Sequence, residues 1–92
     1  MRKQQAKILF QNQSYNIIFT EHAKLQMALR KLEESVVIHI IETGEVKVKE
    51  KKNKFWVFKK VDHRNDNLIS VSISLESPSL IVITAMVNWR PK

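Results

Sequence analysis

The stretch Ile69-Ser70-Val71-Ser72-Ile73-Ser74-Leu75 alternates apolar residues with serines at every second position. Successive side chains of a β-strand point to opposite faces, so this pattern predicts a strand with one face in the core and one face half-exposed. The next apolar stretch, residues 80–87, is apolar at almost every position and predicts a central strand. The turn Ser77-Pro78-Ser79 separates the two, so we expect them to be antiparallel neighbours.

Two further strands are expected upstream of this pair. Val46 and Val48 alternate with lysines, and residues 55–58 form a dense apolar run. Polar residues at 51–54 and 62–67 predict the turns that connect these strands. Short turns imply antiparallel neighbours, so the second half of the chain predicts a meander of four sequential strands.

Two helices are expected before the meander. Thr20 is a preferred N-cap residue and Glu21 follows it, so a helix is predicted over residues 21–31. Its predicted apolar face consists of Leu25, Ala28, Leu29 and Leu32. A second helix is predicted over residues 33–43, because its valines and isoleucines repeat at helical spacing. Gly44, the only glycine of the chain, is predicted to follow it as a C′ residue with positive φ.

At the N-terminus, residues 7–10 and 15–19 are β-prone and flank a polar turn, which predicts a hairpin or a strand with a loose lead-in. The expected fold class is α+β, with two N-terminal helices packed on one face of a four- to five-stranded antiparallel meander sheet. The sequence has no repeat and no linker-like stretch, so residues 1–92 predict a single domain.

The charge of the chain is concentrated in one segment. Of 92 residues, 16 are basic and 9 acidic, which gives a net charge of +7. Seven lysines lie between Lys47 and Lys60, with Glu50 as the only acid among them. Such a field attracts RNA or another polyanion; the alternative is a solvated hairpin whose lysines protect a strand edge. The candidate RNA-binding residues are Lys47, Lys49, Lys51, Lys52, Lys54, Lys59, His63 and Arg64.

Several classes of protein are excluded. The absence of cysteine excludes disulfides, thiolate catalysis and zinc–thiolate sites, and it favours a cytoplasmic setting. The longest apolar stretch is eight residues, too short for a membrane span, so no membrane partner is expected. The three histidines lack the spacing of metal ligands, so neither a metal nor another cofactor is expected.

One set of residues carries a family resemblance. Thr20-Glu21-His22-Ala23 at a helix start, followed by Met27 and Arg30, resembles the "HA…M…R" opening of a family of small uncharacterised bacterial domains, domain-of-unknown-function family 4258 (DUF4258). Gly44-Glu45 after the second helix and Val82-Ile83-Thr84 in the last strand agree with that pattern.

The resemblance covers residues 19–87. It implies a fold related to the barnase-, colicin- and RelE-like nucleases, and with it a metal-independent endoribonuclease of toxin–antitoxin type, with an acidic antitoxin protein as partner. The chain departs from the family at one position, since the family usually carries glycine directly after the arginine, where this chain has Lys31.

Metal-independent RNA cleavage needs a base, an acid and a cation for the phosphorane charge. His22 suits proton transfer at a helix start, and Arg30 suits a phosphate; alternatively, His22 only packs there and Arg30 anchors the helix. Thr84 would bind a phosphate or orient His22, or else fill the strand and bond to backbone. His63 and Arg64 would supply an acid and a phosphate contact, or else form an exposed turn.

Aromatic side chains near the basic residues suit the stacking of RNA bases. They are Trp56, Phe58 and Trp89, of which Trp89 is the expected exposed ring. Three functions stay open. The first is an endoribonuclease with His22, Arg30 and Thr84 as catalytic residues, the second is a non-enzymatic module that binds nucleic acid or an acidic protein, and the third is a toxin scaffold held silent by an acidic antitoxin.

Overall fold

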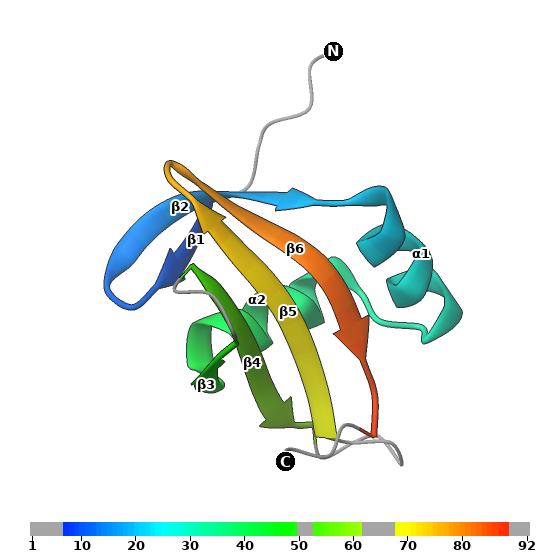
Figure 1. Ribbon diagram of the computed structural model, residues 1–92. Coiled ribbons are helices and arrows are strands. Elements are labelled where there is room, and N and C mark those ends of the chain that lie inside the picture. Colours follow the sequence, from blue (N-terminus) through cyan, green and yellow to red (C-terminus); the bar gives the residue numbers. More distant parts are fainter. Residues whose placement is uncertain (1–6, 50–52, 62–67, 89–92) are drawn as a thin grey trace.

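The computed structural model describes residues 7–49, 53–61 and 68–88. In this part of the chain, six strands and two helices follow in the order β1, β2, α1, α2, β3, β4, β5, β6 (Figure 1). The helices are α1 (Glu21–Leu29) and α2 (Glu34–Thr43). The strands are β1 (Lys7–Phe10), β2 (Gln13–Phe19), β3 (Glu45–Val48), β4 (Lys54–Lys60), β5 (Leu68–Glu76) and β6 (Ser79–Met86).

The strands form one mixed sheet in the order β1-β2-β6-β5-β4-β3. The α+β class and the antiparallel meander from β3 to β6 are confirmed. The predicted size and the purely antiparallel character are wrong, because the N-terminal hairpin joins the sheet through a parallel pairing of β2 with β6. These two strands lie at opposite ends of the chain, so no local sequence pattern reports their pairing.

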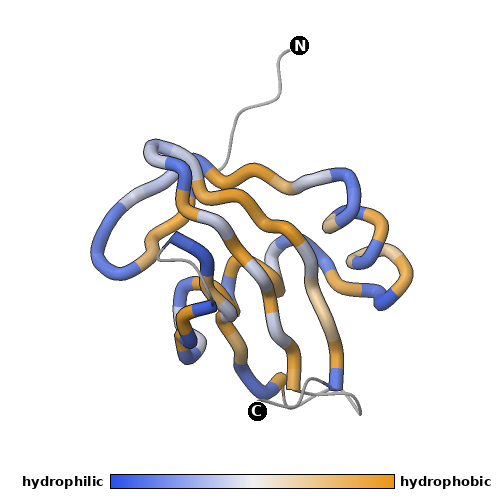
Figure 2. Tube along the Cα trace, in the orientation of Figure 1, coloured by the Kyte–Doolittle hydropathy of each residue, from blue (hydrophilic) through white to orange (hydrophobic). Residues whose placement is uncertain are grey.

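The core lies between the sheet and α2. Helix α2 packs against β4, β5 and β1, which the curl of the sheet brings around it, whereas α1 packs against β6 (Figure 1). Apolar residues run along β2, β6 and α2, and the turn between β1 and β2 is hydrophilic (Figure 2). The buried residues include Ile8, Phe10, Ile17, Val37, Ile40, Ile41, Val57, Ile69, Val71, Ile73, Leu80, Val82 and Ala85.

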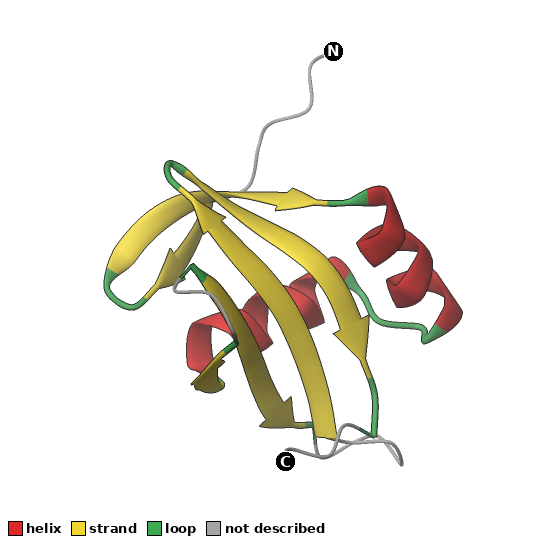
Figure 3. Ribbon diagram, viewed as in Figure 1, coloured by secondary structure: helices red, strands yellow, loops and turns green. Residues whose placement is uncertain are grey.

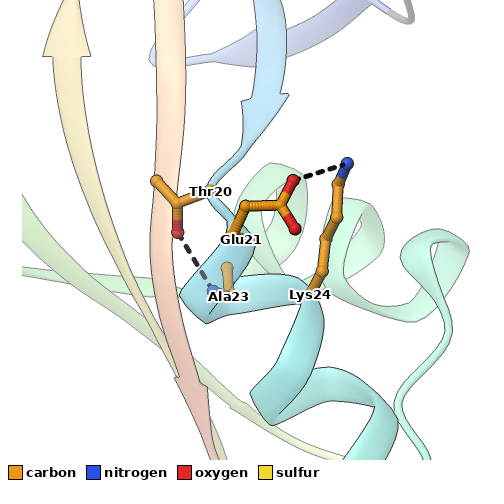
Figure 4. Close-up of polar contacts among 4 residues, drawn as sticks. All are labelled: Thr20, Glu21, Ala23 and Lys24. Carbon is orange, nitrogen blue, oxygen red and sulfur yellow. Dashed lines mark hydrogen bonds and ion pairs between the residues drawn. The ribbon is translucent and has the colours of Figure 1, made fainter.

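The predicted start of α1 is confirmed. The Thr20 hydroxyl accepts a hydrogen bond from the Ala23 N–H at 3.0 Å, and Lys24 lies 3.8 Å from Glu21 on the first turn (Figure 4). The same hydroxyl donates to the Ile83 carbonyl at 3.2 Å. Thr20 therefore both caps the helix and fixes it against β6.

The predicted apolar face of α1 is wrong. The helix buries Ala23 and Met27, and Leu32 is buried just beyond its end. The predicted members that are exposed are Leu25, Ala28 and Leu29, with 56% exposure at Leu25 and 67% at Leu29. Two faces of this short helix carry apolar residues at helical spacing, and the Thr20 contact with β6 turns the Ala23 face inward.

The end of α1 forms a Schellman motif. The Lys31 N–H donates to the Ala28 carbonyl at 3.2 Å, and the Leu32 N–H donates to the Met27 carbonyl at 2.8 Å. Lys31 adopts a positive φ of 56°. This lysine therefore occupies a left-handed position that normally favours glycine, at the point where the expected family pattern has one.

Gly44 follows α2 as predicted, but the predicted positive φ is wrong. Its φ is −80° and its ψ 178°, which is extended backbone. A Cβ atom on Gly44 would lie 2.6 Å from the carbonyl oxygens of both Ile40 and Phe58. Glycine is needed here because the end of α2 and β4 approach too closely for a side chain, and not because the backbone turns left-handed.

No helix within the described ranges has both the length and the apolarity that a membrane span requires.

Candidate nucleic-acid interface

One row of side chains crosses four neighbouring strands. Lys47 of β3 pairs with Trp56 of β4, Trp56 with Ser72 of β5, and Ser72 with Thr84 of β6. Residues directly opposite each other in antiparallel strands project to the same face of the sheet. The register therefore aligns a cation, an aromatic ring and two hydroxyl groups in one line.

This row faces away from α2. The adjacent pair, Val57 and Val71, is fully buried, and α2 packs on β4 and β5. Because side chains alternate along a strand, Trp56 and Ser72 point to the other face. In Figure 3, α2 lies behind the sheet, and the sheet face toward the viewer carries no helix. We call this surface the open face; it includes Glu45, Lys47, Lys49, Lys54, Trp56, Phe58, Ser70, Ser72, Ser74, Glu76, Ile81, Thr84 and Met86.

A β-bulge places Thr84 on the open face. The register between β5 and β6 shifts at Ser72 and Ile73, so that Ile73 pairs with Val82 while Ser72 pairs with Thr84. The pairing skips Ile83, whose carbonyl is the group that accepts from Thr20. Without the extra residue, the strict alternation of β6 would turn Thr84 toward the core.

Lys49 lies over the aromatic ring of the row. Its Nζ atom is 4.5 Å from the centre of the Trp56 ring, which is a cation–π distance, and it donates a hydrogen bond to Ser72 Oγ at 3.0 Å. The Trp56 ring is half-buried. The positive charge of Lys49 is thereby held above the centre of the open face.

A second lysine is held in the same way at the next row. Lys54 Nζ donates to Ser74 Oγ at 3.1 Å, and Ser74 Oγ donates to a carboxylate oxygen of Glu76 at 3.0 Å. The serine face of β5 was predicted to be half-exposed, and this is wrong: Ser72 is 0% exposed and Ser74 3%. The reason is that long side chains from β3 and β4 cover these serines.

Ser70 is also fully buried on the open face, opposite Phe58 and Met86. Its Oγ atom is the one buried side-chain polar atom without a hydrogen-bond partner in the described part of the chain. A buried hydroxyl without a partner is destabilising by about 1–3 kcal/mol.

The predicted RNA-binding lysines do not share one surface. Lys47, Lys49 and Lys54 lie on the open face. Lys59 points to the helix side, where its Nζ atom donates to Thr43 Oγ1 at 2.7 Å and lies 3.2 Å from His39 Nε2. The remaining predicted residues lie outside the described ranges; they are Lys51, Lys52, His63 and Arg64. Trp89, the expected exposed ring, also lies outside these ranges.

The predicted catalytic residues lie on two different elements. His22 is exposed in the first turn of α1, and Arg30 is half-buried at the C-cap, where its side chain donates to Gln26 Oε1. Eight residues of helix separate them by ~12 Å along the axis. Thr84 is half-buried on the open face. The catalytic role of these three residues stays a prediction.

The sequence interpretation named Lys49, Trp56 and Thr84 as candidate residues, but it did not name the serines of β5 as part of the site. The alternation of β5 showed that Ser70, Ser72 and Ser74 share a face, but only the strand register places Lys49 and Trp56 above them. Within the described ranges, no three His, Asp or Glu side chains come together as a metal site would require.

Comparison with known proteins gives one match. A family model described as "Domain of unknown function (DUF4258)" matches residues 19–87. The matched region runs from the end of β2 to just beyond β6, so it includes both helices and all four strands of the open face. No curated protein and no solved structure matches the chain.

Proposed function

The chain belongs to the family described as Domain of unknown function DUF4258, and from this premise we propose that it binds single-stranded RNA on the open face of its sheet. The observation that carries the proposal is the row of Lys47, Trp56, Ser72 and Thr84 with Lys49 above it.

The lysines support a polyanion as the ligand. Lys47, Lys49 and Lys54 project from adjacent positions of β3 and β4, and a nucleic acid bound there would exchange condensed counterions for their ammonium groups. Ser74 connects Lys54 to Glu76, and Glu45 is the next residue on the same face of β3 beyond Lys47. The positive charge is therefore concentrated between these two acids, and phosphates would bind there, at Lys47 and Lys49.

The aromatic rings support a single strand rather than a duplex. Trp56 and Phe58 are half-buried neighbours on the same face of β4, and the bases of a single strand stack on rings presented by a sheet. Lys49 lies over the Trp56 ring in the free protein, so a base stacks on Trp56 only when Lys49 turns from the ring to a phosphate. The hydroxyl of Thr84 adds a group that can donate to or accept from a base or a ribose. In a duplex the faces of the bases are stacked on one another, so Trp56 and Phe58 would find no exposed base face to stack on.

Binding without turnover is the function that the geometry supports best. His22 and Arg30 lie at opposite ends of α1, and among the predicted catalytic residues only Thr84 belongs to the open face. The endoribonuclease activity that the family resemblance suggested is tested in the same experiment, since a cleaved oligonucleotide would be seen directly.

The test is the fluorescence anisotropy of a labelled single-stranded RNA titrated with protein at several salt concentrations. The variants are Lys49→Ala and Trp56→Leu, with Lys24→Ala of α1 as the charge-matched control. We expect Lys49→Ala to weaken binding and to lower the slope of log K against log salt by about 0.7, the value for one phosphate contact on a single strand. Trp56→Leu should weaken binding and leave that slope unchanged.

Parallel titrations use single-stranded DNA and an acidic peptide, and gel analysis of the RNA in EDTA reports cleavage by the wild type and by His22→Ala. The proposal is wrong if the RNA does not bind at low salt, if Lys24→Ala weakens binding as much as Lys49→Ala, or if the acidic peptide binds more tightly than the RNA.

A further inference from the structure

The two edges of the sheet differ in how they are covered. At the β1 edge, the Leu9 N–H donates to a carboxylate oxygen of Glu42 at 3.1 Å, because the curl of the sheet brings α2 against β1. At the β3 edge all four residues are exposed, with 38% exposure at Val46 and 59% at Val48. The β3 edge is thus a solvent-exposed strand in which two valines alternate with Glu45 and Lys47, and an exposed strand edge can pair with another chain.

The pairing of β3 with β4 determines which peptide N–H and C=O groups of β3 point toward the open edge. The Lys49 N–H donates to the Lys54 carbonyl at 2.9 Å, so the peptide groups of Lys49 point toward β4. In an antiparallel pair the N–H and C=O groups of alternate residues point to opposite sides. The peptide groups of Val46 and Val48 therefore point away from β4, to the side on which a further strand would add.

We propose that the strand added at this edge is β3 of a second copy of the chain, which pairs antiparallel about a two-fold axis at Val46. In this arrangement Val46 of one copy exchanges two hydrogen bonds with Val46 of the other. The two sheets then become continuous, and the two open faces lie on the same side of the joined sheet.

Charge sets this register. With Val46 opposite itself, Glu45 of each copy lies directly opposite Lys47 of the other, on the open face. A shift that places Val46 opposite Val48 sets the two Lys47 side chains against each other, and the opposite shift sets Glu45 against Glu45. Like charges directly opposite are destabilising in a sheet, so the register centred on Val46 is the favoured one.

The valine side chains support the same arrangement. Val46 and Val48 pair with Val57 and Phe55, so they lie on the helix side of the sheet, at its exposed margin. Pairing covers Val46 with its counterpart and places Val48 opposite Gly44, which has no side chain to oppose it. Because β3 is only four residues long, the dimer is expected to dissociate at low concentration.

Sedimentation equilibrium from low micromolar to millimolar concentration tests the proposal through charge reversal. The wild type is expected to be dimeric at the upper end of this range. Glu45→Lys and Lys47→Glu each set like charges opposite one another and should give monomers throughout. The double variant carrying both changes has the same net charge as the wild type and should regain the dimer.

A cysteine pair tests the register, because the chain has no cysteine of its own. With Val46→Cys the two thiols face each other at the axis, where the Cα separation of a hydrogen-bonded pair is about 5.5 Å, within the range of a disulfide. With Val48→Cys the two Cα atoms lie ~13 Å apart along the strands. Mild oxidation should cross-link the first variant rapidly and the second slowly.

A wild type that stays monomeric at all concentrations would overturn the proposal, as would a double charge variant that stays monomeric or a Val48→Cys variant that cross-links as fast as Val46→Cys. None of these measurements involves RNA, so their outcome is independent of the proposed function. Circular dichroism of each variant checks that the fold is retained.

Discussion

Lys49 covers the ring of Trp56, with its Nζ atom 4.5 Å from the ring centre, and the same atom donates to Ser72 Oγ. The contact joins the residue directly after β3 to β4 and β5, at the point where a ligand would meet the open face. Its contribution to folding can be separated from any contribution to binding.

The first prediction concerns this contact. Lys49→Met keeps most of the aliphatic stem and removes the charge, so the free energy of unfolding should fall by about 1–2 kcal/mol, the sum of a partly exposed cation–π contact and a hydrogen bond. Urea unfolding measures this change, and in a Trp89→Phe background the fluorescence of Trp56 should change as well. Lys24→Met on α1 is the control and should change neither quantity. Equal effects of both lysines would contradict the prediction.

The second prediction concerns Lys31, whose φ of 56° is left-handed. Lys31→Gly should stabilise the protein by about 1 kcal/mol, because glycine adopts this conformation without a steric penalty. Lys24→Gly, inside the same helix, should destabilise it by about 1 kcal/mol. Thermal unfolding of the two variants should therefore give shifts of opposite sign. A destabilised Lys31→Gly would mean that Lys31 contacts outweigh the backbone strain.

The third prediction concerns Gly44. Gly44→Ala should destabilise the protein by about 1–3 kcal/mol, because the added Cβ would lie 2.6 Å from two carbonyl oxygens. Gly44→Asn distinguishes the causes, since asparagine tolerates a positive φ but has the same Cβ. We expect Asn to be no better than Ala in urea unfolding. A clear rescue by Asn would restore the left-handed role that the sequence suggested.

The fourth prediction compares two serines of β5. Ser70→Ala removes a buried hydroxyl without a partner and should stabilise the protein by about 1 kcal/mol. Ser72→Ala removes the acceptor of Lys49 and should destabilise it by about 0.5–1.5 kcal/mol. The two substitutions are chemically identical and two residues apart, so each is the other's control in the same unfolding assay. If both substitutions changed the free energy of unfolding in the same direction, the assignment of a hydrogen-bond partner to Ser72 and of none to Ser70 would be wrong.

Local signals in the sequence were sufficient for most elements. The N-cap at Thr20, the helical spacing of α2 and the alternation of β5 each depend on residues close together in the chain, and the cap, the helix and the strand that they predicted are confirmed. The parallel pairing of β2 with β6 and the buried face of α1 depend on contacts across the whole chain, and both were missed.

The candidate site shows the same division. The lysine-rich segment was visible in the sequence, but strand alternation divides it, so that Lys49 lies on the open face while Lys59 contacts Thr43 on the other side. Thr84 joins the open face through a bulge, and a single inserted residue leaves no signal in an apolar strand. The sequence therefore could not predict which face of the sheet a side chain occupies wherever the pairing register of its strand was unknown.

The pairing of β2 with β6 has a consequence for biosynthesis. The β1–β2 hairpin reaches the rest of the sheet only through β6, and the hydroxyl that caps α1 is held by a carbonyl of β6. Strands β1 and β2 are synthesised before β6 and therefore wait for it before they can complete the sheet. Helix α2 can pack against this hairpin earlier, but until β6 is made the edge of β2 stays unpaired and open to chaperones or to other nascent chains.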